Sequence, residues 1–369
     1  MLQISNVWIC KKCGSRWYYD VGKCVYCGSE IEVTEPGAYT VKGITKVLIP
    51  SVEHPDVPYY DLLLEDEHGN LHILKTSEKY EIGSIISRKG EKGIPRKIGI
   101  IGTGIMGVGI ASVALQFECE VILKSRSDEA LGEALKKIEN YLLKTVDIKE
   151  KDRILGNIKP TTDFDDIKYS DIVIECVVED LEIKKQVFKE LDEVCLDKTV
   201  LATNTSSLSI DDLASVISDP SRFVGMHFFN PVSKMRLVEI VRGKNTSKKT
   251  IELVMSFVEQ LNKIPILVSE SPGFIVNRII MPYLNEAAHM LEQETATAED
   301  IDTAAKLGLN LPMGPLALLD LIGLDTFLAI MKNLYKRTGD AKYKPCSLIE
   351  KMVKNGRLGQ KTKQGFFKY

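Results

Sequence analysis

A histidine and a glutamate twelve residues apart are the side chains in this sequence best suited to acid–base chemistry. His227 lies in the run GMHFFNP at residues 225–231, and Glu239 lies in LVEIV. An imidazole exchanges a proton near neutral pH, and a neighbouring carboxylate can hold the ring in one orientation. A lone histidine is more often structural, but the run NTSSLSI with Ser206, together with Asn230, favours a catalytic pair.

The sequence GTGIMG at residues 102–107 has the spacing of a dinucleotide-binding loop. It follows the apolar run KIGII and precedes a predicted helix that extends to residue 117. Gly102 permits a tight turn, Gly104 lets the backbone approach a pyrophosphate, and Gly107 lets the helix pack closely. With Ile105 and Met106, these glycines are the predicted cofactor-binding loop, whose helix N-terminus favours phosphates.

The end of the second predicted strand indicates which dinucleotide is bound. An acidic residue usually binds the ribose hydroxyls of NAD at this position, but this chain has Ser125 followed by Arg126. A small hydroxyl and a guanidinium accept a 2′-phosphate that a carboxylate would repel. These two residues favour NADP. The alternative is that the cations are a solvated strand end and that NAD is used.

Four of the eight cysteines form two CxxCG pairs near the N-terminus: Cys10 with Cys13, and Cys24 with Cys27. Four thiolates at this spacing suit one tetrahedral zinc ion in a structural site, since four cysteine ligands leave no open position. The alternatives are redox dithiols, cysteines without a ligand, or iron. The remaining cysteines share no spacing and are expected to be small buried apolar residues: Cys119, Cys176, Cys195 and Cys346.

Four domains are expected around these residues. Residues 1–32 would form a zinc ribbon, and residues 33–92 an OB-fold-like barrel of short strands with a hairpin turn at EHGN, residues 67–70. Strands and helices alternate over residues 95–272, which predicts an α/β doubly wound sheet of the Rossmann type. Residues 273–369 read as an all-helical C-terminal domain.

Composition narrows the class of protein. The chain has 369 residues, 44% of them hydrophobic and 27% charged, with a net charge of -3. No basic excess favours nucleic acid as a partner. No apolar run reaches the 18 or so residues of a membrane span, and no signal peptide is recognisable, so we expect a cytoplasmic protein.

Several long motifs in order make the segment from residue 96 to 369 resemble the 3-hydroxyacyl-CoA dehydrogenase family. They are IGTGIMG, NTSSLSI, GMHFFNP, LVEIV, SPGFIVNR, LPMGPLALLDLIGLD and GRLGQKTKQGFFKY. The resemblance implies a Rossmann-type domain, an acyl-CoA substrate and a helical domain that forms a homodimer. Residues 1–92 resemble zinc-ribbon/OB-fold modules associated with acyl-CoA enzymes, whose members often accompany a thiolase.

The family resemblance also implies catalytic roles. His227 would take the proton of the 3-hydroxyl group while hydride passes to nicotinamide, and Glu239 would orient the imidazole. Ser206 and Asn277 would hydrogen-bond the substrate oxygens, where charge develops. The implied reaction interconverts 3-oxoacyl-CoA and (S)-3-hydroxyacyl-CoA, with short chains such as acetoacetyl-CoA.

Further positions match cofactor contacts of the family. Glu179, Lys184 and Lys361 match residues that contact the nicotinamide cofactor. Ser206 is a further expected cofactor contact, and Asn230 would support His227 and the nicotinamide side. Two departures stand out: the ribose-binding acid is replaced by Ser125, and Lys363 replaces a glycine common in the terminal motif.

Two other functions remain open at this point. A dehydrogenase of free β-hydroxyacids would share the glycine loop, but it would use a lysine in a glycine-rich helix motif, which this sequence lacks. A scaffold protein that recruits a thiolase through its N-terminal module could retain the dehydrogenase fold without activity. Retention of His227 and Glu239 favours the enzyme over the scaffold.

Overall fold

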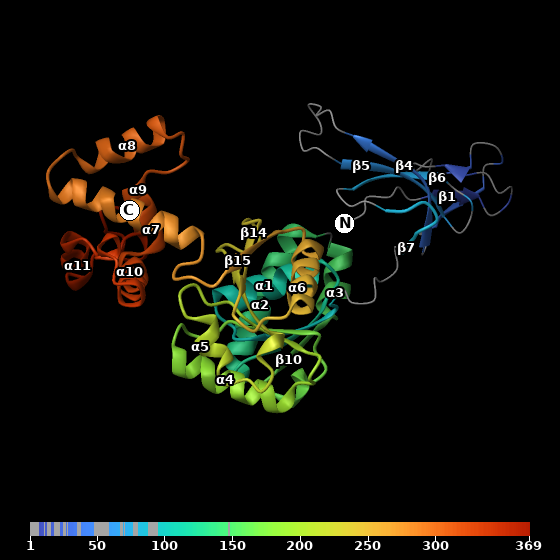
Figure 1. Cartoon of the computed structure of the whole chain (residues 1–369), viewed down its shortest axis with the longest axis horizontal. Coiled ribbons are helices and arrows are strands. Elements are labelled where there is room, and N and C mark those ends of the chain that lie inside the picture. Colours follow the sequence, from blue (N-terminus) through green and yellow to red (C-terminus); the bar gives the residue numbers. More distant parts are fainter. Residues whose placement is uncertain are drawn as a thin grey trace. The chain divides into compact units, whose positions relative to one another are not determined.

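The computed structural model describes residues 7–10, 12, 16–17, 23–24, 27, 29–34, 38–47, 59–66, 69, 71–76, 80–87, 95–146 and 148–369. The chain divides into two compact units, Met1–Ile94 and Pro95–Tyr369. Each is described by itself (Figure 1).

The described part of the first unit is built from antiparallel strands. One sheet has the order β2-β1-β3 and the other the order β6-β5-β4-β7. Their bounds are β1 (Val7–Cys10), β2 (Arg16–Trp17), β3 (Ile31–Thr34), β4 (Ala38–Val47), β5 (Tyr59–Asp66), β6 (Leu71–Thr76) and β7 (Ile85–Ser87). Strands β5 and β6 pair antiparallel around Gly69, whose φ is 77°, so the expected hairpin is present. A closed OB-like barrel stays a prediction.

The second unit contains the expected doubly wound sheet. Its eight strands have the order β10-β9-β8-β11-β12-β13-β14-β15, and all neighbours are parallel except β13 and β14. The strands are β8 (Lys97–Ile101), β9 (Glu120–Lys124), β10 (Ile158–Thr161), β11 (Ile172–Glu175), β12 (Val200–Thr203), β13 (Phe223–Phe228), β14 (Leu237–Arg242) and β15 (Ile264–Ser269). The strand order reverses direction at β8, so the loop after β8 lies where ligands bind in such sheets.

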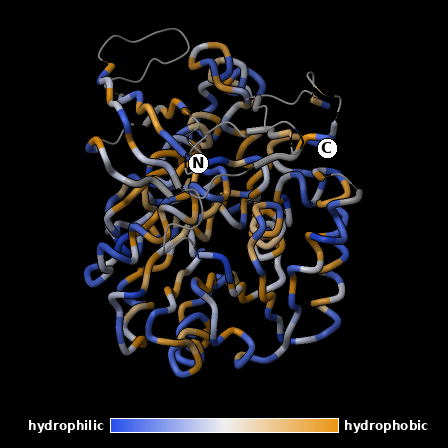
Figure 2. Tube along the Cα trace, turned by 90° about the vertical axis from the view of Figure 1, so that its right-hand side faces the viewer, coloured by the Kyte–Doolittle hydropathy of each residue, from blue (hydrophilic) through white to orange (hydrophobic). Residues whose placement is uncertain are grey.

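Helices cover the sheet because both of its faces are apolar. In β11, Ile172 and Ile174 belong to one buried cluster with α1, whereas Val173 belongs to another with α4. The helices of this region are α1 (Ile105–Gln116), α2 (Asp128–Thr145), α3 (Ile148–Leu155), α4 (Leu181–Val194), α5 (Ile210–Ala214) and α6 (Lys248–Gln260). Hydrophilic and hydrophobic residues alternate along the helical segments of the tube in Figure 2, as helices with one buried face require.

The remainder of the chain is helical, as expected, and has a separate apolar core. Leu284 of α7 packs in this core with Leu319 of α9 and Phe327 of α10. The helices are α7 (Val276–Glu292), α8 (Ala298–Gly308), α9 (Pro315–Ile322), α10 (Leu324–Thr338) and α11 (Ser347–Lys354). Short 3-10 turns are η1 (Asp165–Ile167), η2 (Pro220–Arg222), η3 (Ala341–Tyr343) and η4 (Gln360–Thr362).

The three loop glycines meet different steric conditions. Gly102 has a φ of 111°, which side chains other than that of glycine rarely allow, and a Cβ there would lie 2.7 Å from the Cys176 carbonyl oxygen. A Cβ on Gly107 would lie 2.0 Å from the Gly102 carbonyl oxygen. No atom lies within 4 Å of a Cβ built on Gly104. The protein therefore leaves no room for a side chain at Gly102 and Gly107, whereas the space beside Gly104 is free.

We expect Gly107→Ala to lower the free energy of unfolding by about 1–3 kcal/mol, because α1 must move away from the loop. Gly104→Ala, which meets no neighbour, is the matched control and should change it by less than about 0.5 kcal/mol. Chemical denaturation of both variants measures the difference. Equal stability of the two variants would contradict the steric account.

Candidate active site

The loop after β8 lies beside the end of β9. The Gly102 amide donates to the Lys124 carbonyl oxygen at 2.9 Å. Ser125 is buried, and its Oγ lies 3.1 Å from the Thr103 Oγ1. Arg126 is exposed, whereas the Lys124 Nζ lies 3.6 Å above the Phe164 ring. The guanidinium of Arg126 is therefore the cation at this strand end that solvent and a ligand can reach.

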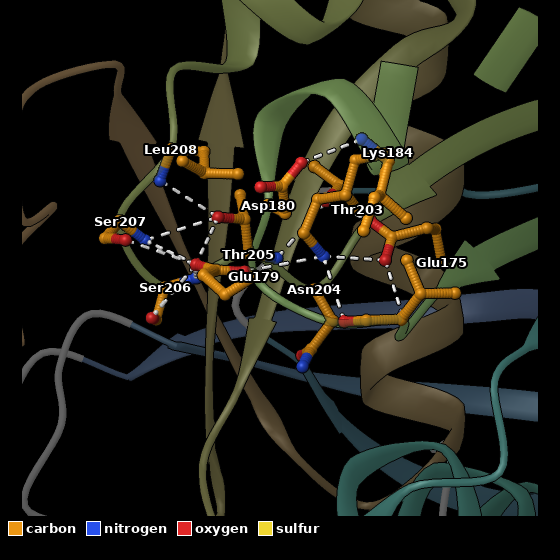
Figure 3. Close-up of polar contacts among 12 residues, drawn as sticks. Glu175, Glu179, Asp180, Lys184, Thr203, Asn204, Thr205, Ser206, Ser207 and Leu208 are labelled. Atoms are coloured by element: carbon orange, nitrogen blue, oxygen red, sulfur yellow. Dashed lines mark hydrogen bonds and ion pairs between the residues drawn. The ribbon is translucent and has the colours of Figure 1, made fainter. Parts of the chain in front are cut away.

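A buried ion pair lies at the end of β11 (Figure 3). Glu175 Oε1 accepts from the Lys184 Nζ at 2.6 Å and from the Val177 amide at 2.6 Å. Its Oε2 accepts from the Thr203 Oγ1 at 2.8 Å. Both charged side chains are almost fully buried. Strand β11 ends at Glu175, whose carboxylate accepts a hydrogen bond from the Val177 amide just beyond the strand.

Lys184 also reaches a second carboxylate. Its Nζ lies 3.4 Å from the Glu179 Oε2. Burial by itself would raise the pKa of Glu179, but the charge of Lys184 and hydrogen bonds from Thr205 and Ser206 outweigh it, so the pKa is lowered. Glu179 is therefore ionised at neutral pH. The ammonium of Lys184 is buried between two carboxylates rather than presented to a ligand.

Glu179 organises the loop after β12 (Figure 3). Its Oε1 accepts from the Thr205 hydroxyl at 2.7 Å and from the Ser206 amide at 2.9 Å. The Ser206 hydroxyl and both the amide and the hydroxyl of Ser207 lie 3.2 Å from the same oxygen. One carboxylate oxygen thus gathers the polar groups of three consecutive residues.

His227 and Glu239 face each other across the antiparallel pair of β13 and β14. They are directly opposite in the register, and the His227 Nδ1 lies 2.6 Å from the Glu239 Oε2. Both residues are buried. The ring of His227 is flanked by Phe229 and Phe274, with centroids at 4.4 Å and 5.7 Å. The pair leaves the second ring nitrogen, Nε2, as the one that can meet a substrate.

The second oxygen of Glu239 is held by the start of α7. Its Oε1 accepts from the backbone amides of Ile275 at 2.8 Å and Val276 at 3.0 Å. Burial would raise the pKa of Glu239, but the hydrogen bonds from His227 and Val276 lower it. The carboxylate is therefore charged and fixed at both oxygens, as an orienting group for an imidazole must be.

The first turn of α7 also contacts the loop that carries Ser206. The Asn277 Nδ2 donates to the Ser206 carbonyl oxygen at 3.2 Å. From the Rossmann-type part, the Asn204 Oδ1 accepts from the Phe228 amide at 2.9 Å and so links the loop to β13. Ser206, Asn277 and His227 thus come from three elements that are tied to one another by hydrogen bonds.

The other residues with predicted roles lie in less connected positions. Asn230 is exposed just after β13. Ile105 is exposed at the start of α1, while Met106 packs on the core. Lys361, in η4, forms an ion pair with Asp325 at the start of α10.

Several residues of this network carried no predicted role. Glu175 is a carboxylate inside the otherwise apolar run DIVIECVV, and a buried charge requires a partner. That signal could have found Glu175 and its lysine nine residues later. Nothing in the spacing of Thr203, Asn204 and Thr205 indicates which backbone or side chain each one contacts.

Three of the predicted zinc ligands lie together in the first unit. The sulfur atoms of Cys10, Cys24 and Cys27 all lie within 4.8 Å of one another. Hydrogen bonds from the Ser29 side chain and backbone, and then from Cys10 and Cys24, lower the pKa of Cys27 to about 6. Cys13 falls outside the described residues.

Among the helices that the structure describes, none has the length and apolar character needed to cross a membrane.

Comparison with known proteins identifies the family that this chain matches. Residues 97–271 match the family model of the 3-hydroxyacyl-CoA dehydrogenase NAD binding domain, and residues 273–369 match the model of its C-terminal domain. A 3-hydroxybutyryl-CoA dehydrogenase of Clostridioides difficile is 49% identical over 278 residues, which are 74% of this chain and 99% of the relative. The human mitochondrial hydroxyacyl-coenzyme A dehydrogenase is 39% identical over 298 residues, 78% of this chain and 95% of that protein.

A solved structure agrees with these relatives. The (S)-3-hydroxybutyryl-CoA dehydrogenase of Ralstonia eutropha matches with a TM-score of 0.73 at 44% identity. The match covers 74% of this chain and 99% of that one.

We expect Lys184→Met to lower the free energy of unfolding by about 3–5 kcal/mol at pH 8, because it leaves Glu175 as an unpaired buried carboxylate. Burial raises the pKa of Glu175 against the opposing pull of Lys184, and loss of the ammonium raises it further. The folded variant then holds a proton that the unfolded chain releases, so its stability falls as pH rises above the ordinary glutamate range.

The loss of unfolding free energy in Lys184→Met should therefore be smaller at pH 5 than at pH 8 in guanidinium unfolding curves. Lys185→Met, which removes a half-buried lysine lying 4.0 Å from the exposed Glu182, is the matched control. A deficit that is the same for both variants, or that grows toward low pH, would contradict the buried-pair account.

Proposed function

The chain belongs to the 3-hydroxyacyl-CoA dehydrogenase family, and from this premise we propose that it interconverts 3-oxoacyl-CoA and (S)-3-hydroxyacyl-CoA. The observation that carries the proposal is the buried His227–Glu239 pair with its 2.6 Å contact. Short acyl chains, as in acetoacetyl-CoA, are the proposed substrates, since relatives at 49% and 45% identity are named as 3-hydroxybutyryl-CoA dehydrogenase and probable 3-hydroxybutyryl-CoA dehydrogenase. The scaffold alternative finds no support in these comparisons.

Each residue of the site has a separate role in the proposed reaction. When bound, a nicotinamide cofactor would supply the hydride donor or acceptor, held by the loop that is open at Gly104. His227 would hold the proton at Nε2 and exchange it with the 3-oxygen of the substrate, while Glu239 keeps the ring in the tautomer that this requires. The Ser206 hydroxyl and the Asn277 amide would hydrogen-bond the substrate oxygens and stabilise charge as it develops.

Glu179 and Lys184 would act by positioning. The lysine is buried between Glu175 and Glu179, and the Glu179 oxygen holds the loop that presents Ser206. We propose that Glu179, whose side chain is 37% exposed, also borders the cofactor. Asn230 and Lys361 are proposed as further cofactor contacts.

NADP is the cofactor that we propose, with NAD as the alternative. The end of β9 offers the Ser125 hydroxyl and the exposed Arg126 where a carboxylate would bind the ribose of NAD. A guanidinium forms charge-assisted hydrogen bonds with the 2′-phosphate of NADP, and the 2′-hydroxyl of NAD offers no charge for such bonds.

The N-terminal unit is proposed to bind one structural zinc ion through Cys10, Cys13, Cys24 and Cys27. The clustered sulfurs of the three described cysteines fit this ligand set. We further propose that the module tethers a thiolase, so that 3-oxoacyl-CoA passes between neighbouring sites at raised effective concentration. Absence of any thiolase from material purified at low salt would oppose the tether.

A homodimer through the C-terminal domain completes the proposal. Apolar side chains are exposed on its helices and on the loop after α8, among them Ile279, Leu307 and Leu309. Burial of these side chains against a second copy would remove their apolar surface from water. Sedimentation of the full chain measures the oligomeric state.

Glu239→Gln should lower turnover in acetoacetyl-CoA reduction by about 100- to 10,000-fold, because the imidazole loses its charged orienting partner. The affinity for the reduced cofactor, measured by fluorescence titration, should stay within about threefold of the wild-type value, since neither Glu239 nor His227 belongs to the glycine loop. Glu252→Gln on the exposed face of α6 is the matched control. Wild-type turnover in Glu239→Gln would refute the assignment of the pair.

Arg126→Ala, which removes a charge-assisted hydrogen bond, and Ser125→Asp, which places a repelling carboxylate beside the 2′-phosphate, should each lower kcat/KM for NADPH by about 10- to 100-fold. The value for NADH should change little in Arg126→Ala and rise in Ser125→Asp. Arg153→Ala, which removes another exposed arginine, is the control. A wild-type preference for NADH, unchanged in these variants, would show that NAD is the cofactor.

A further inference from the structure

A second cluster of metal-ligating side chains lies in the helical domain, apart from the proposed catalytic residues. His289 and Glu292 project from the last turn of α7, three residues apart. Cys346 is the N-cap residue of α11. One ligand atom from each of the three residues lies within 4.8 Å of those of the other two.

Two of the three separations between these atoms are close to those of ligands on one ion, and the third is at most 4.8 Å. The Cys346 Sγ lies 3.3 Å from the Glu292 Oε2, and the His289 Nδ1 lies 3.6 Å from the same oxygen. Tetrahedral zinc bonds about 2.3 Å long to sulfur and about 2.0–2.2 Å long to nitrogen and oxygen place neighbouring ligands about 3.3–3.6 Å apart. The three donor atoms therefore lie close enough together to bind one ion after small side-chain adjustments.

The surroundings hold the donor atoms in place. The Cys346 amide donates to the Asn285 Oδ1 at 2.9 Å, and the Asn285 Nδ2 donates to the Lys344 carbonyl oxygen at 2.9 Å. The Ser347 hydroxyl donates to the Glu292 Oε1 and so fixes the carboxylate from its other side. Second partners of this kind orient metal ligands and raise metal affinity.

An ion can reach the cluster from solvent. The side chains of His289 and Glu292 are 34% and 28% exposed, and Glu292 also lines a surface cavity of about 410 Å³ beside Lys351 and Arg357. Cys346, by contrast, is fully buried. The site would thus have a buried sulfur, two half-buried donors and a fourth position for water.

We propose that His289, Glu292 and Cys346 form a zinc site that joins the end of α7 to the start of α11. On binding, the Cys346 thiol releases its proton to solvent and a sulfur–zinc bond forms, with no change of oxidation state. Imidazole, carboxylate and thiolate together are a donor set typical of zinc. Because α7 begins at the residues that hold Glu239, the ion would anchor the far end of the same helix.

A hydrogen-bonded cluster without metal is the competing account. Burial raises the pKa of the Cys346 thiol to about 11, so without an ion the sulfur is protonated and donates to Glu292. The two accounts differ in the amount of metal that the folded chain retains.

The test uses the full chain, stripped with a chelator under reducing conditions and titrated with Co²⁺ as the spectroscopic probe. His289→Ala changes a residue that is one-third exposed, so it should fold like the wild type. Cys346→Ser removes the sulfur, and Cys119→Ser, an equally buried cysteine outside the cluster, is the matched control. Circular dichroism of each variant checks that it is folded.

Wild type and Cys119→Ser should bind one equivalent of Co²⁺ more than His289→Ala and Cys346→Ser do. The difference spectrum of wild type minus His289→Ala should carry a sulfur-to-cobalt charge-transfer band and tetrahedral d–d bands. This difference is independent of any ion held by the N-terminal cysteines, because those are present in every variant. Equal metal content in wild type and folded His289→Ala, or a difference spectrum without the sulfur band, would overturn the proposal.

Discussion

The arrangement of the active site depends on one buried carboxylate that is used at both oxygens. Glu239 contacts the imidazole of His227 through one oxygen and the first amides of α7 through the other. Without those amides the charge would lose two of the three hydrogen bonds that compensate for its burial. The same interaction that orients the histidine therefore also fixes the start of the helix that carries Asn277.

A second group of buried charged residues fixes the loop of Ser206 at the ends of the neighbouring strands. Glu175 and Glu179 share the buried ammonium of Lys184, and Glu179 passes this organisation on to the loop of Ser206. A lone lysine at this depth would be costly, and so would either unpaired carboxylate. Because each charge needs the others, the loop conformation follows from the carboxylate at the strand end together with the hydroxyl groups that the loop supplies to it.

Much of the fold was predictable from local pattern. The apolar runs with alternating helices predicted the doubly wound sheet, and the GTGIMG spacing predicted the loop at its switch point, where Gly102 has the positive φ that the turn needs. The motif residues His227 and Glu239 were also predictable as a candidate pair from their motifs, whereas their contact comes from the register of β13 and β14. The length of β11 was not, because its end depends on hydrogen bonds to Glu175 from Val177, Lys184 and Thr203.

The sequence by itself determined which residue types are available and in what order, because glycine spacing, strand periodicity and motif order are local properties. Only the tertiary structure decided which side chains share a charge or a hydrogen bond. Lys184, for which a cofactor contact stays a prediction, is enclosed by two carboxylates. Cys346, expected to be a small buried apolar residue, is buried and also lies against Glu292 near His289. These contacts join residues 5 to 57 positions apart, and which of them meet is set by packing rather than by spacing along the chain.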